Sequence, residues 1–438
     1  MKISQFLERL NKSWQKIDKI TNFLVFLAIF FLAVQFCCPP ALAAEPVTIN
    51  ILVYARGAAL LKPYMEEFHK THPDIEVNVI EGPHATNLVE DLYTSSFLLG
   101  NSPYDLVYID PVWMPKFAAA GWLLDLSDRL SAKEMSEFVS IELEAGKYQG
   151  KLYRVPFLSS CAMVFYRKDL LEKAGYEPPE TFEQLIEISQ AVQKQGLVNW
   201  GYVWQGKQYE GLSAMFVEIL QGYGAFWIDP QTLEVGLDRP EAIEAVKFLR
   251  TTIDTEVSPP GVTTYQEDET RRLFQSGQVL FLRNWSYVYN LASQPDSPIR
   301  GKFDIKPMVS VPGKNSASCA GGWGLAIAKS SKHPDEAWQV IQFLTSLDIQ
   351  RQYILETGYV PSLVSLFTDP QIVAKYNYYP QLLEVIKNGV LRPSIAQYAQ
   401  ASDILQRYLS AAITNKMSPK RAMKAAANET RRLLKTSE

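Results

Sequence analysis

The feature that most constrains the fold of this chain is an alternation of predicted strands and helices near its amino terminus. Alternating or continuous apolar residues indicate strands, and helical spacing of apolar residues indicates the segments between them. In chain order these segments are 47–53, 61–68, 75–79, 86–99 and 105–110. Such a β-α-β-α-β order favours a parallel sheet with helices on its faces, so the predicted fold class is α/β. Ligands of such sheets bind beyond the carboxyl ends of the strands, where Asp110 and the turn 54–57 are placed.

Later segments carry further strand and helix signals. An apolar run, 155–166, predicts one more strand. Thr181 and Gln184 have the spacing of a capping box, which predicts a helix start. Three prolines are placed as first helical residues, and they are Pro240, Pro334 and Pro419. The chain is therefore predicted to be α/β early and rich in helices late.

The first 43 residues have the pattern of a secretory signal peptide. Five basic residues precede an apolar stretch, 23–36, and Ala41-Leu42-Ala43 matches the small-x-small motif of signal peptidase. The apolar stretch is short for a transmembrane span, which needs about 20 residues. We therefore expect a cleaved, soluble product that is exported from the cytoplasm. A retained or lipid-anchored form is the alternative, because Cys37 and Cys38 directly follow the apolar stretch.

Removal of this leader leaves a mildly acidic chain of about 395 residues. It retains 38 basic and 45 acidic side chains, a net charge of −7. Because phosphate binding needs a basic surface, nucleic acid is not an expected partner. The length exceeds one ordinary core and predicts two domains, in a chain that we expect to be a monomer. Cys161 and Cys319 are the two cysteines outside the leader, and a disulfide and two buried free thiols both remain open.

No sequence pattern of catalysis or cofactor binding occurs. The four histidines, at positions 69, 72, 84 and 333, lack metal-ligand spacing. A nucleophile elbow, a phosphate-binding glycine loop and a Cys-x-x-Cys motif are all missing. We therefore expect neither a metal nor a cofactor. A secreted glycoside-processing enzyme remains the alternative, because the sequence does not show how far apart two catalytic carboxylates would lie.

Two tryptophan-containing segments indicate ligand binding. Trp285 and Tyr287 lie two residues apart, so an extended segment would turn both rings to one side. Gly321 and Gly322 precede Trp323 and would let a ligand approach main-chain N–H groups. Flat aromatic faces beside bare backbone suit the apolar face of a sugar ring. Core packing and a local bend are the structural alternatives.

Two charged residues are candidates for orienting hydroxyl groups. Arg392, beside Pro393, presents a fork of donors that suits vicinal hydroxyls. Asp110 presents acceptors at the end of its strand. A solvent-facing arginine and a cap of the following turn are the structural alternatives for these two residues.

With these residues the chain resembles the extracellular solute-binding proteins of carbohydrate ABC importers, and among them the trehalose/maltose-binding proteins. The likeness covers nearly all of the chain after the leader. Its most specific pieces are 166–171, 201–212, 283–285 and 321–323. The resemblance implies a protein that captures a disaccharide or a glucosylated polyol, of the trehalose, maltose, sucrose or glucosylglycerol type, and delivers it to a membrane permease. A sugar sensor without transport is an alternative.

The resemblance also implies two α/β lobes that close on the ligand about crossing segments. The implied boundaries are 44–157 with 323–360 for the amino-terminal lobe, and 158–322 with 361–438 for the carboxyl-terminal lobe. The implied crossings lie near 156–160, 318–322 and 359–362. Because both cysteines would then lie beside the hinge, the resemblance favours a Cys161–Cys319 disulfide.

Residue by residue, the resemblance assigns roles to the positions that match. Sugar stacking falls to Trp285, Tyr287 and Trp323, main-chain contacts to Gly321 and Gly322, and hydroxyl contacts to Asp110 and Arg392. Other positions depart from the family pattern. Leu158 and Ser160 stand where the family has a tyrosine and an aspartate, an acid is replaced near 57–58, and an arginine near 88–89. Ligand class is therefore expected to carry over better than ligand identity.

Overall fold

The structure of the protein is a computed structural model that describes residues 46–84 and 86–435. Nearer the amino terminus it describes 3–9, 11–14, 16, 21–24 and 27. The predicted cleavage motif at 41–43 and the cysteines at 37 and 38 lie outside these residues, as does most of the apolar stretch before them. Among the residues that the structure describes, no helix is long and apolar enough to cross a membrane.

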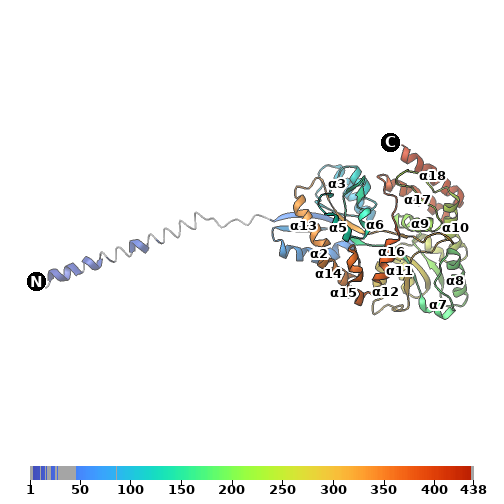
Figure 1. Ribbon diagram of the computed structural model, residues 1–438, viewed down its shortest axis with the longest axis horizontal. Coiled ribbons are helices and arrows are strands. Elements are labelled where there is room, and N and C mark those ends of the chain that lie inside the picture. Colours follow the sequence, from blue (N-terminus) through green and yellow to red (C-terminus); the bar gives the residue numbers. More distant parts are fainter. Residues whose placement is uncertain are drawn as a thin grey trace.

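Two β-sheets divide this part of the chain into two lobes, which lie side by side in Figure 1. The first lobe is built on six strands in the order β13-β6-β12-β3-β1-β2, and the second on four strands in the order β10-β7-β9-β8. The first-lobe strands are β1 (Val47–Tyr54), β2 (Ile75–Gly82), β3 (Leu106–Ile109), β6 (Val155–Ser159), β12 (Trp323–Ile327) and β13 (Val360–Pro361). The second-lobe strands are β7 (Ala162–Tyr166), β8 (Trp200–Val203), β9 (Val279–Trp285) and β10 (Asp304–Lys306).

The parallel sheet predicted at the amino terminus is confirmed. β1 pairs in parallel with β2 on one side and with β3 on the other. Helices α2 (Ala55–Thr71) and α3 (Thr86–Leu98) connect these strands. The segment 54–57 was expected to be a turn, but Tyr54 ends β1 and Gly57 lies in the first turn of α2. A Cβ at Gly57 would come within 2.8 Å of the Tyr54 ring, so the missing side chain lets the helix begin directly after the strand.

Four of the remaining helices begin where the sequence predicted. Thr181 caps α8 in a capping box with Gln184, and the three prolines begin α10, α13 and α18. Helices that accompany the first sheet include α4 (Met114–Ala119), α5 (Ala132–Glu137), α6 (Ser140–Glu144), α13 (Pro334–Thr345) and α14 (Leu347–Thr357). The second lobe contains α7 (Lys168–Ala174), α8 (Phe182–Lys194), α9 (Glu210–Gly222), α10 (Pro240–Asp254), α11 (Glu267–Gln275), α12 (Tyr287–Ala292), α17 (Tyr398–Ile413) and α18 (Pro419–Lys435). Two further helices, α15 (Pro370–Lys375) and α16 (Tyr379–Lys387), lie near the boundary of the lobes (Figure 1).

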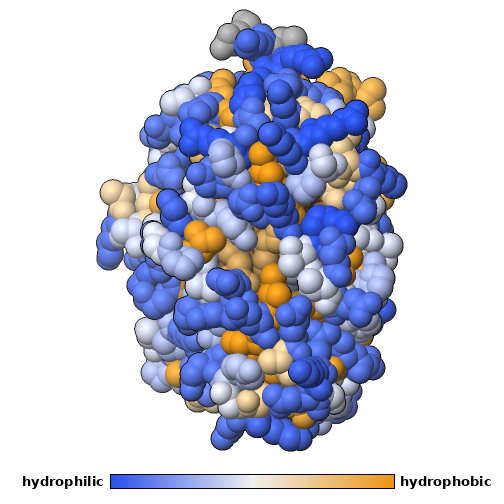
Figure 2. Space-filling view, turned by 90° about the vertical axis from the view of Figure 1, so that its right-hand side faces the viewer, coloured by the Kyte–Doolittle hydropathy of each residue, from blue (hydrophilic) through white to orange (hydrophobic). Residues whose placement is uncertain are grey.

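The outer end of the second lobe is mainly hydrophilic. Figure 2 views the right-hand side of Figure 1, where α7, α8, α10 and α18 lie, and shows small hydrophobic areas separated by hydrophilic residues. Inside this lobe, α9 is almost wholly buried, and six of the seven residues of β9 are buried. The apolar residues of the lobe therefore form a core around these two elements.

The segment predicted as one strand, 155–166, is divided between the two sheets. Its first half, β6, pairs with β12 in the first lobe, and its second half, β7, pairs with β9 in the second lobe. Ser160 and Cys161 join the halves. The Ser362 hydroxyl donates to the Pro156 carbonyl at 3.1 Å, and Cys161 bridges to Ala320. Three crossing segments thus lie together at the junction of the lobes.

The disulfide favoured by the resemblance is not formed. Both Cys161 and Cys319 are buried free thiols. Cys161 lies opposite Ala320 in the bridge, and neighbouring residues of an extended segment point to opposite faces. Cys319 therefore turns away from Cys161, and it packs instead with Ala162, Ala214 and Trp285.

Candidate functional site

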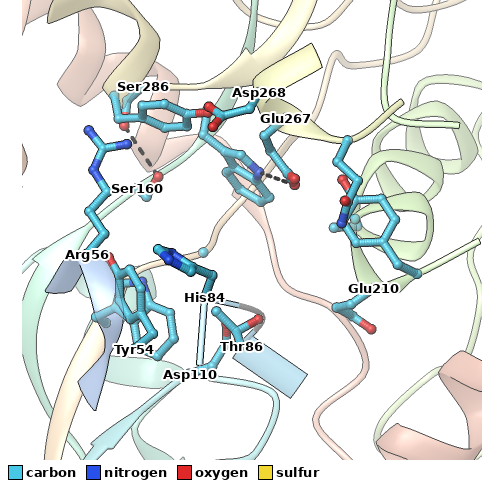
Figure 3. Close-up of a pocket in the computed structure, with 18 of the residues that line it drawn as sticks. Tyr54, Arg56, His84, Thr86, Asp110, Ser160, Glu210, Glu267, Asp268 and Ser286 are labelled. Carbon is cyan, nitrogen blue, oxygen red and sulfur yellow. Dashed lines mark hydrogen bonds between the residues drawn. The ribbon is translucent and has the colours of Figure 1, made fainter. Parts of the chain in front are cut away.

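A cavity of about 490 Å³ is lined by residues of both lobes. Figure 3 shows Tyr54, Arg56 and Asp110 of the first lobe facing Glu210 and Glu267 of the second across it. Six of the seven residues predicted to bind a ligand line this cavity. These six are Asp110, Trp285, Tyr287, Gly321, Trp323 and Arg392. The structure therefore brings together residues that lie almost 300 positions apart in the sequence.

Trp285 ends β9 and enters the cavity with its orientation fixed. The guanidinium carbon of Arg283 lies 4.7 Å from the centre of its ring, in a cation–π contact. Its indole N–H donates to Oε1 of Glu267 at 3.4 Å. The backbone of Gly321 lies against the ring, since a Cβ there would come within 2.9 Å of it. The ring is thereby positioned before any ligand arrives.

Arg283 is itself held by a buried network. Its Nε donates to Oε2 of Glu218 at 3.0 Å, and its Nη2 donates to Oε1 of the same carboxylate. Its Nη1 donates to the side-chain oxygen of Gln205 at 2.9 Å. Burial acts to lower the pKa of Arg283, but the Glu218 carboxylate outweighs this and raises the pKa above its ordinary value. Asn284 donates to the carbonyl of Glu267 at 3.0 Å and so ties α11 to β9. Each residue of the Arg-Asn-Trp motif thus supports the same wall of the cavity.

Tyr287 reaches the cavity by a different route from the one predicted. β9 ends at Trp285, Ser286 has helical dihedral angles, and Tyr287 is the first residue of α12. The two rings are therefore not on one side of an extended strand, although both line the cavity. The prediction of a shared strand face was wrong because the chain turns into a helix between them.

Trp323 belongs to an aromatic cluster of the first lobe. Its ring stacks with Tyr54 at 5.1 Å and with Tyr108 at 4.8 Å between centroids. Trp113 meets it edge to face at 5.6 Å and is buried behind it. Tyr54 and Trp323 both line the cavity, so the first-lobe wall presents a group of packed rings where the second lobe presents single ones.

The two glycines before Trp323 serve mainly as space for other groups. The Gly321 N–H already donates to the Ser160 carbonyl at 2.9 Å, so it is not available to a ligand. Gly322 does not line the cavity. A Cβ on Gly322 would lie 2.2 Å from the carbonyl oxygen of Leu158 and 2.4 Å from the carboxylate of Glu142. Gly321 therefore remains a residue of the cavity wall, although its N–H is taken by the protein, whereas Gly322 makes room for Leu158 and Glu142.

Arg392 is buried and joins acids of both lobes. Its Nη2 donates to Asp110 at 3.1 Å, and its Nη1 donates to Glu210 at 2.8 Å. Burial acts to lower the pKa of Arg392, but Asp110 and neighbouring groups raise it well above its ordinary value. Asp110 also accepts from the Val112 N–H at 3.1 Å, so it caps the following turn as well. The alternative of a solvent-facing arginine is excluded, because Arg392 is only 6% exposed.

Several cavity residues were not predicted from the sequence. Glu210 accepts hydrogen bonds from Tyr398 and from Ser402, in addition to Arg392. Further unpredicted charged residues that line the cavity are Arg56, Glu267, Asp268, Glu269 and Arg272. Glu210 lies in the most specific resemblance segment, 201–212, and this segment was the available signal for it. Arg56 lies in the turn 54–57, which the sequence placed at the ligand-binding edge of the sheet without singling out this residue. The four residues of α11 gave no local signal, because helix starts rich in acids are common on protein surfaces.

The crossing segments supply the floor between the two walls. Leu158 and Ser160, which depart from the resembled family, both line the cavity. The hydroxyl groups of Ser160 and Ser286 lie 3.3 Å apart and form a hydrogen bond.

Within the described part of the chain, no group of three or more histidine, cysteine, aspartate or glutamate residues is arranged to hold a metal ion.

Comparison with known proteins gives consistent matches over most of the chain. The family described as bacterial extracellular solute-binding protein matches residues 54–351. A probable ABC transporter-binding protein of Deinococcus radiodurans is 30% identical over 365 residues, which are 82% of this chain and 86% of that protein. A maltotriose-binding protein of Pyrococcus abyssi is 27% identical over 70% of this chain and 64% of its own length. The solved structure of maltose-bound T. maritima MalE3 is 35% identical, covers 88% of this chain and all of its own, and has a TM-score of 0.82.

Proposed function

The chain belongs to the bacterial extracellular solute-binding proteins, and we propose that it captures a disaccharide or a glucosylated polyol between its lobes. The family consists of solute-binding proteins, and the relatives named above include an ABC transporter-binding protein, a maltotriose-binding protein and a maltose-bound protein. The chain is therefore a sugar-binding protein of an ABC transporter and not an enzyme. We propose further that residues 1–43 are a signal peptide and that the product is periplasmic and monomeric. The lobe boundaries are part of the same proposal. We keep the predicted boundary at 322/323 and move the other two to 159/160 and 361/362, because the predicted 157/158 and 360/361 would divide β6 and β13.

The observation that carries the ligand proposal is the pairing of aromatic rings with charged hydrogen-bonding groups around one cavity. A volume of about 490 Å³ lies within the roughly 300–1,000 Å³ typical of small-molecule pockets. Trp285 and Trp323, from opposite lobes, offer ring faces for the apolar sides of pyranose rings. The identity of 35% to a maltose-bound protein supports an α-glucoside among the candidates.

Orientation of the sugar hydroxyls would fall to the charged residues that line the cavity. Asp110 and Arg392 form one group across the cleft, and Glu210 and Glu267 add acceptors on the second-lobe side. Hydrogen bonds to charged groups contribute about 1.5–3 kcal/mol each, which is enough to distinguish one hydroxyl arrangement from another. These carboxylates are supported by protein donors, so they are positioned before the ligand binds.

Closure of the lobes then follows from contacts with both walls. A ligand shifts an open–closed equilibrium only by its difference in affinity for the two conformations. A sugar held between Trp285 and Trp323 touches both lobes at once and so favours the closed form. The membrane permease would receive the ligand from that closed form.

Calorimetry of the purified protein against maltose, trehalose, sucrose and glucosylglycerol tests the proposal, with the recovered sugar analysed for hydrolysis. We expect tight binding of at least one of the four sugars, which is recovered unchanged. Absence of binding to all four would overturn the ligand proposal and leave the family membership standing. Hydrolysed sugar would contradict a binding function and support a glycoside-processing enzyme.

A further inference from the structure

Arg56 is a charged residue of the first lobe that meets the second lobe across the cavity. Its guanidinium carbon lies 5.2 Å from the centre of the Tyr287 ring, in a cation–π contact. Arg56 belongs to the first turn of α2, directly after β1, whereas Tyr287 begins α12, directly after β9. Figure 3 shows Arg56 reaching from the side of Tyr54 toward Ser286, the residue before Tyr287. The contact therefore joins the two lobes.

Arg56 has no competing partner among the described residues of its own lobe. Its guanidinium forms no hydrogen bond or ion pair with them, and the side chain is exposed at the rim of the cavity. The other two arginines that line the cavity are both paired, Arg392 with Asp110 and Arg272 with Asp268 at 3.7 Å. Arg56 is thus free to leave Tyr287 when the lobes separate, at no cost in other contacts.

The second-lobe side of this contact is electrostatically favourable for a cation. Glu267 and Asp268, in the first turn of α11, line the cavity beside Tyr287. Burial, and after it these two carboxylates, raise the pKa of Tyr287 above its ordinary value. Asp268 is already paired with Arg271 at 3.2 Å and with Arg272 at 3.7 Å. A guanidinium at this position is therefore attracted by the Tyr287 ring and by the Glu267 carboxylate near it.

We infer that Arg56 and Tyr287 form an interlobe latch, which holds the lobes together over the bound ligand and slows its release. The contact exists only when the lobes are close, so it stabilises the closed conformation relative to the open one. The inference rests on the proposed function only for the choice of ligand. It also gives Tyr287 a role in closure, beside the sugar stacking predicted for it.

Stopped-flow measurement of ligand release tests the latch. Arg56→Gln removes the charge and retains most of the side chain's length. Lys62→Gln is the matched control, because Lys62 is an exposed cation of the same helix that does not line the cavity. We expect Arg56→Gln to raise koff of the bound sugar about three- to tenfold with kon within twofold, and Lys62→Gln to change neither rate. A koff for Arg56→Gln within twofold of the wild-type value would overturn the latch.

A double-mutant cycle separates the latch from independent effects on the sugar. Tyr287→Leu removes the ring that Arg56 contacts and also a predicted stacking surface. If the two side chains act on each other, Tyr287→Leu raises koff less in the Arg56→Gln background than in the wild-type background. Fully independent effects of the two substitutions on koff would overturn the pairing.

Small-angle X-ray scattering without ligand provides a test that does not depend on the sugar. The latch predicts a larger radius of gyration for Arg56→Gln than for the wild type, because the open conformation gains population. Identical scattering of the two proteins would overturn it. If the wild type bound no sugar in calorimetry, the proposed function would fail, and the scattering result would still decide the latch.

Discussion

The two lobes build opposite walls of one cavity from different kinds of side chain. The first lobe presents a cluster of packed rings, in which Trp323 stacks on Tyr54 and Tyr108, and the rim arginine Arg56. The second lobe presents Trp285, backed by a buried guanidinium, and a set of carboxylates from α9 and α11. The first wall is thus stabilised mainly by ring packing and the second mainly by hydrogen-bonded charge.

Each lobe also buries one arginine–glutamate pair close to the cavity. Arg283 and Glu218 of the second lobe are both 0% exposed and share two hydrogen bonds. Arg154 and Glu142 of the first lobe are 0% and 1% exposed, and one nitrogen of Arg154 reaches the carboxylate at 3.1 Å. A second nitrogen of Arg154 donates to the main-chain carbonyl of Glu142 at 2.9 Å. The Glu218 carboxylate therefore accepts two hydrogen bonds from its arginine, whereas the Glu142 carboxylate accepts one.

The largest expected effect comes from removing these carboxylates. Glu218→Leu leaves Arg283 buried without a counter-charge and should lower the free energy of unfolding by about 3–5 kcal/mol. Glu142→Leu should have an effect at the lower end of this range, because it removes one hydrogen bond of its arginine, whereas Glu218→Leu removes two. Urea unfolding of both variants measures the difference.

A double variant serves as the control for this prediction. Glu218→Leu combined with Arg283→Met removes both charges and should recover much of the lost stability. Equal destabilisation by Glu142→Leu and Glu218→Leu would show that the two lobes depend on their buried pairs to the same extent, contrary to the comparison.

The two tryptophans should respond differently to truncation. Trp323→Ala removes a ring that is packed among three others and should lower the free energy of unfolding by about 2–3 kcal/mol, less than for a fully buried tryptophan. Trp285→Ala should leave the fold intact and weaken sugar binding at least tenfold, about 1.4 kcal/mol. Thermal unfolding and calorimetry measure the two effects.

An exposed aromatic residue provides the control for the tryptophan variants. Tyr176 of the second lobe is 38% exposed and does not line the cavity. Tyr176→Ala should therefore change neither the free energy of unfolding nor the sugar affinity appreciably. Unchanged sugar affinity in Trp285→Ala would remove the stacking proposal for the second-lobe wall.

The adjacent glycines allow a finer test of the same contrast. Gly322→Ala places a methyl group against Leu158 and Glu142 and should destabilise the protein by about 1–3 kcal/mol. Gly321→Ala meets the Trp285 ring at 2.9 Å, so it should displace the ring and weaken sugar binding severalfold with a smaller loss of stability. Thermal unfolding followed by circular dichroism measures the loss of stability, and calorimetry measures the loss of sugar affinity. Equal losses of stability in the two variants would contradict the assignment of Gly321 to the site and Gly322 to packing.

The smallest effect concerns the two thiols at the junction of the lobes. Burial raises the pKa of Cys319 to about 12, and burial likewise raises the pKa of Cys161. A thiol stays protonated below its pKa, so both should react slowly with alkylating reagents at pH 8, and faster as the pH approaches 12 or after unfolding. Peptide mapping after alkylation in denaturant should find both thiols modified. An unmodified pair that needs a reductant would show a disulfide and contradict the structure.

The sequence could predict the parts of this fold that depend on neighbouring residues. The capping box of Thr181 and Gln184 and the proline at the start of α10 were confirmed because each acts within one helical turn. The parallel first sheet was predicted because hydrophobic periodicity reports strand and helix directly. The motif 283–285, which lies in the second-lobe wall, could be recognised because its three residues are contiguous in the sequence.

Other features depended on contacts between distant segments. The run 155–166 reads as one strand, and its division at Ser160 is set by pairing with two different sheets. The helix that begins at Tyr287 separates two rings that sequence spacing placed together. The turn 54–57 was placed at the ligand-binding edge, but the contact of Arg56 with Tyr287 gave no signal, because the two residues lie more than 200 positions apart on different lobes.

The sequence by itself determined the α/β class, the helix starts at Thr181, Pro240, Pro334 and Pro419, the family resemblance and six residues that line the cavity. Tertiary structure alone decided that Arg392 joins Asp110 to Glu210, that Gly322 accommodates Glu142, and that both cysteines stay free. The physical reason is the distance along the sequence over which each kind of interaction acts. Backbone propensity and hydrophobic periodicity act over a few residues, whereas charge pairing, ring stacking and close packing depend on which distant side chains folding brings within a few ångströms.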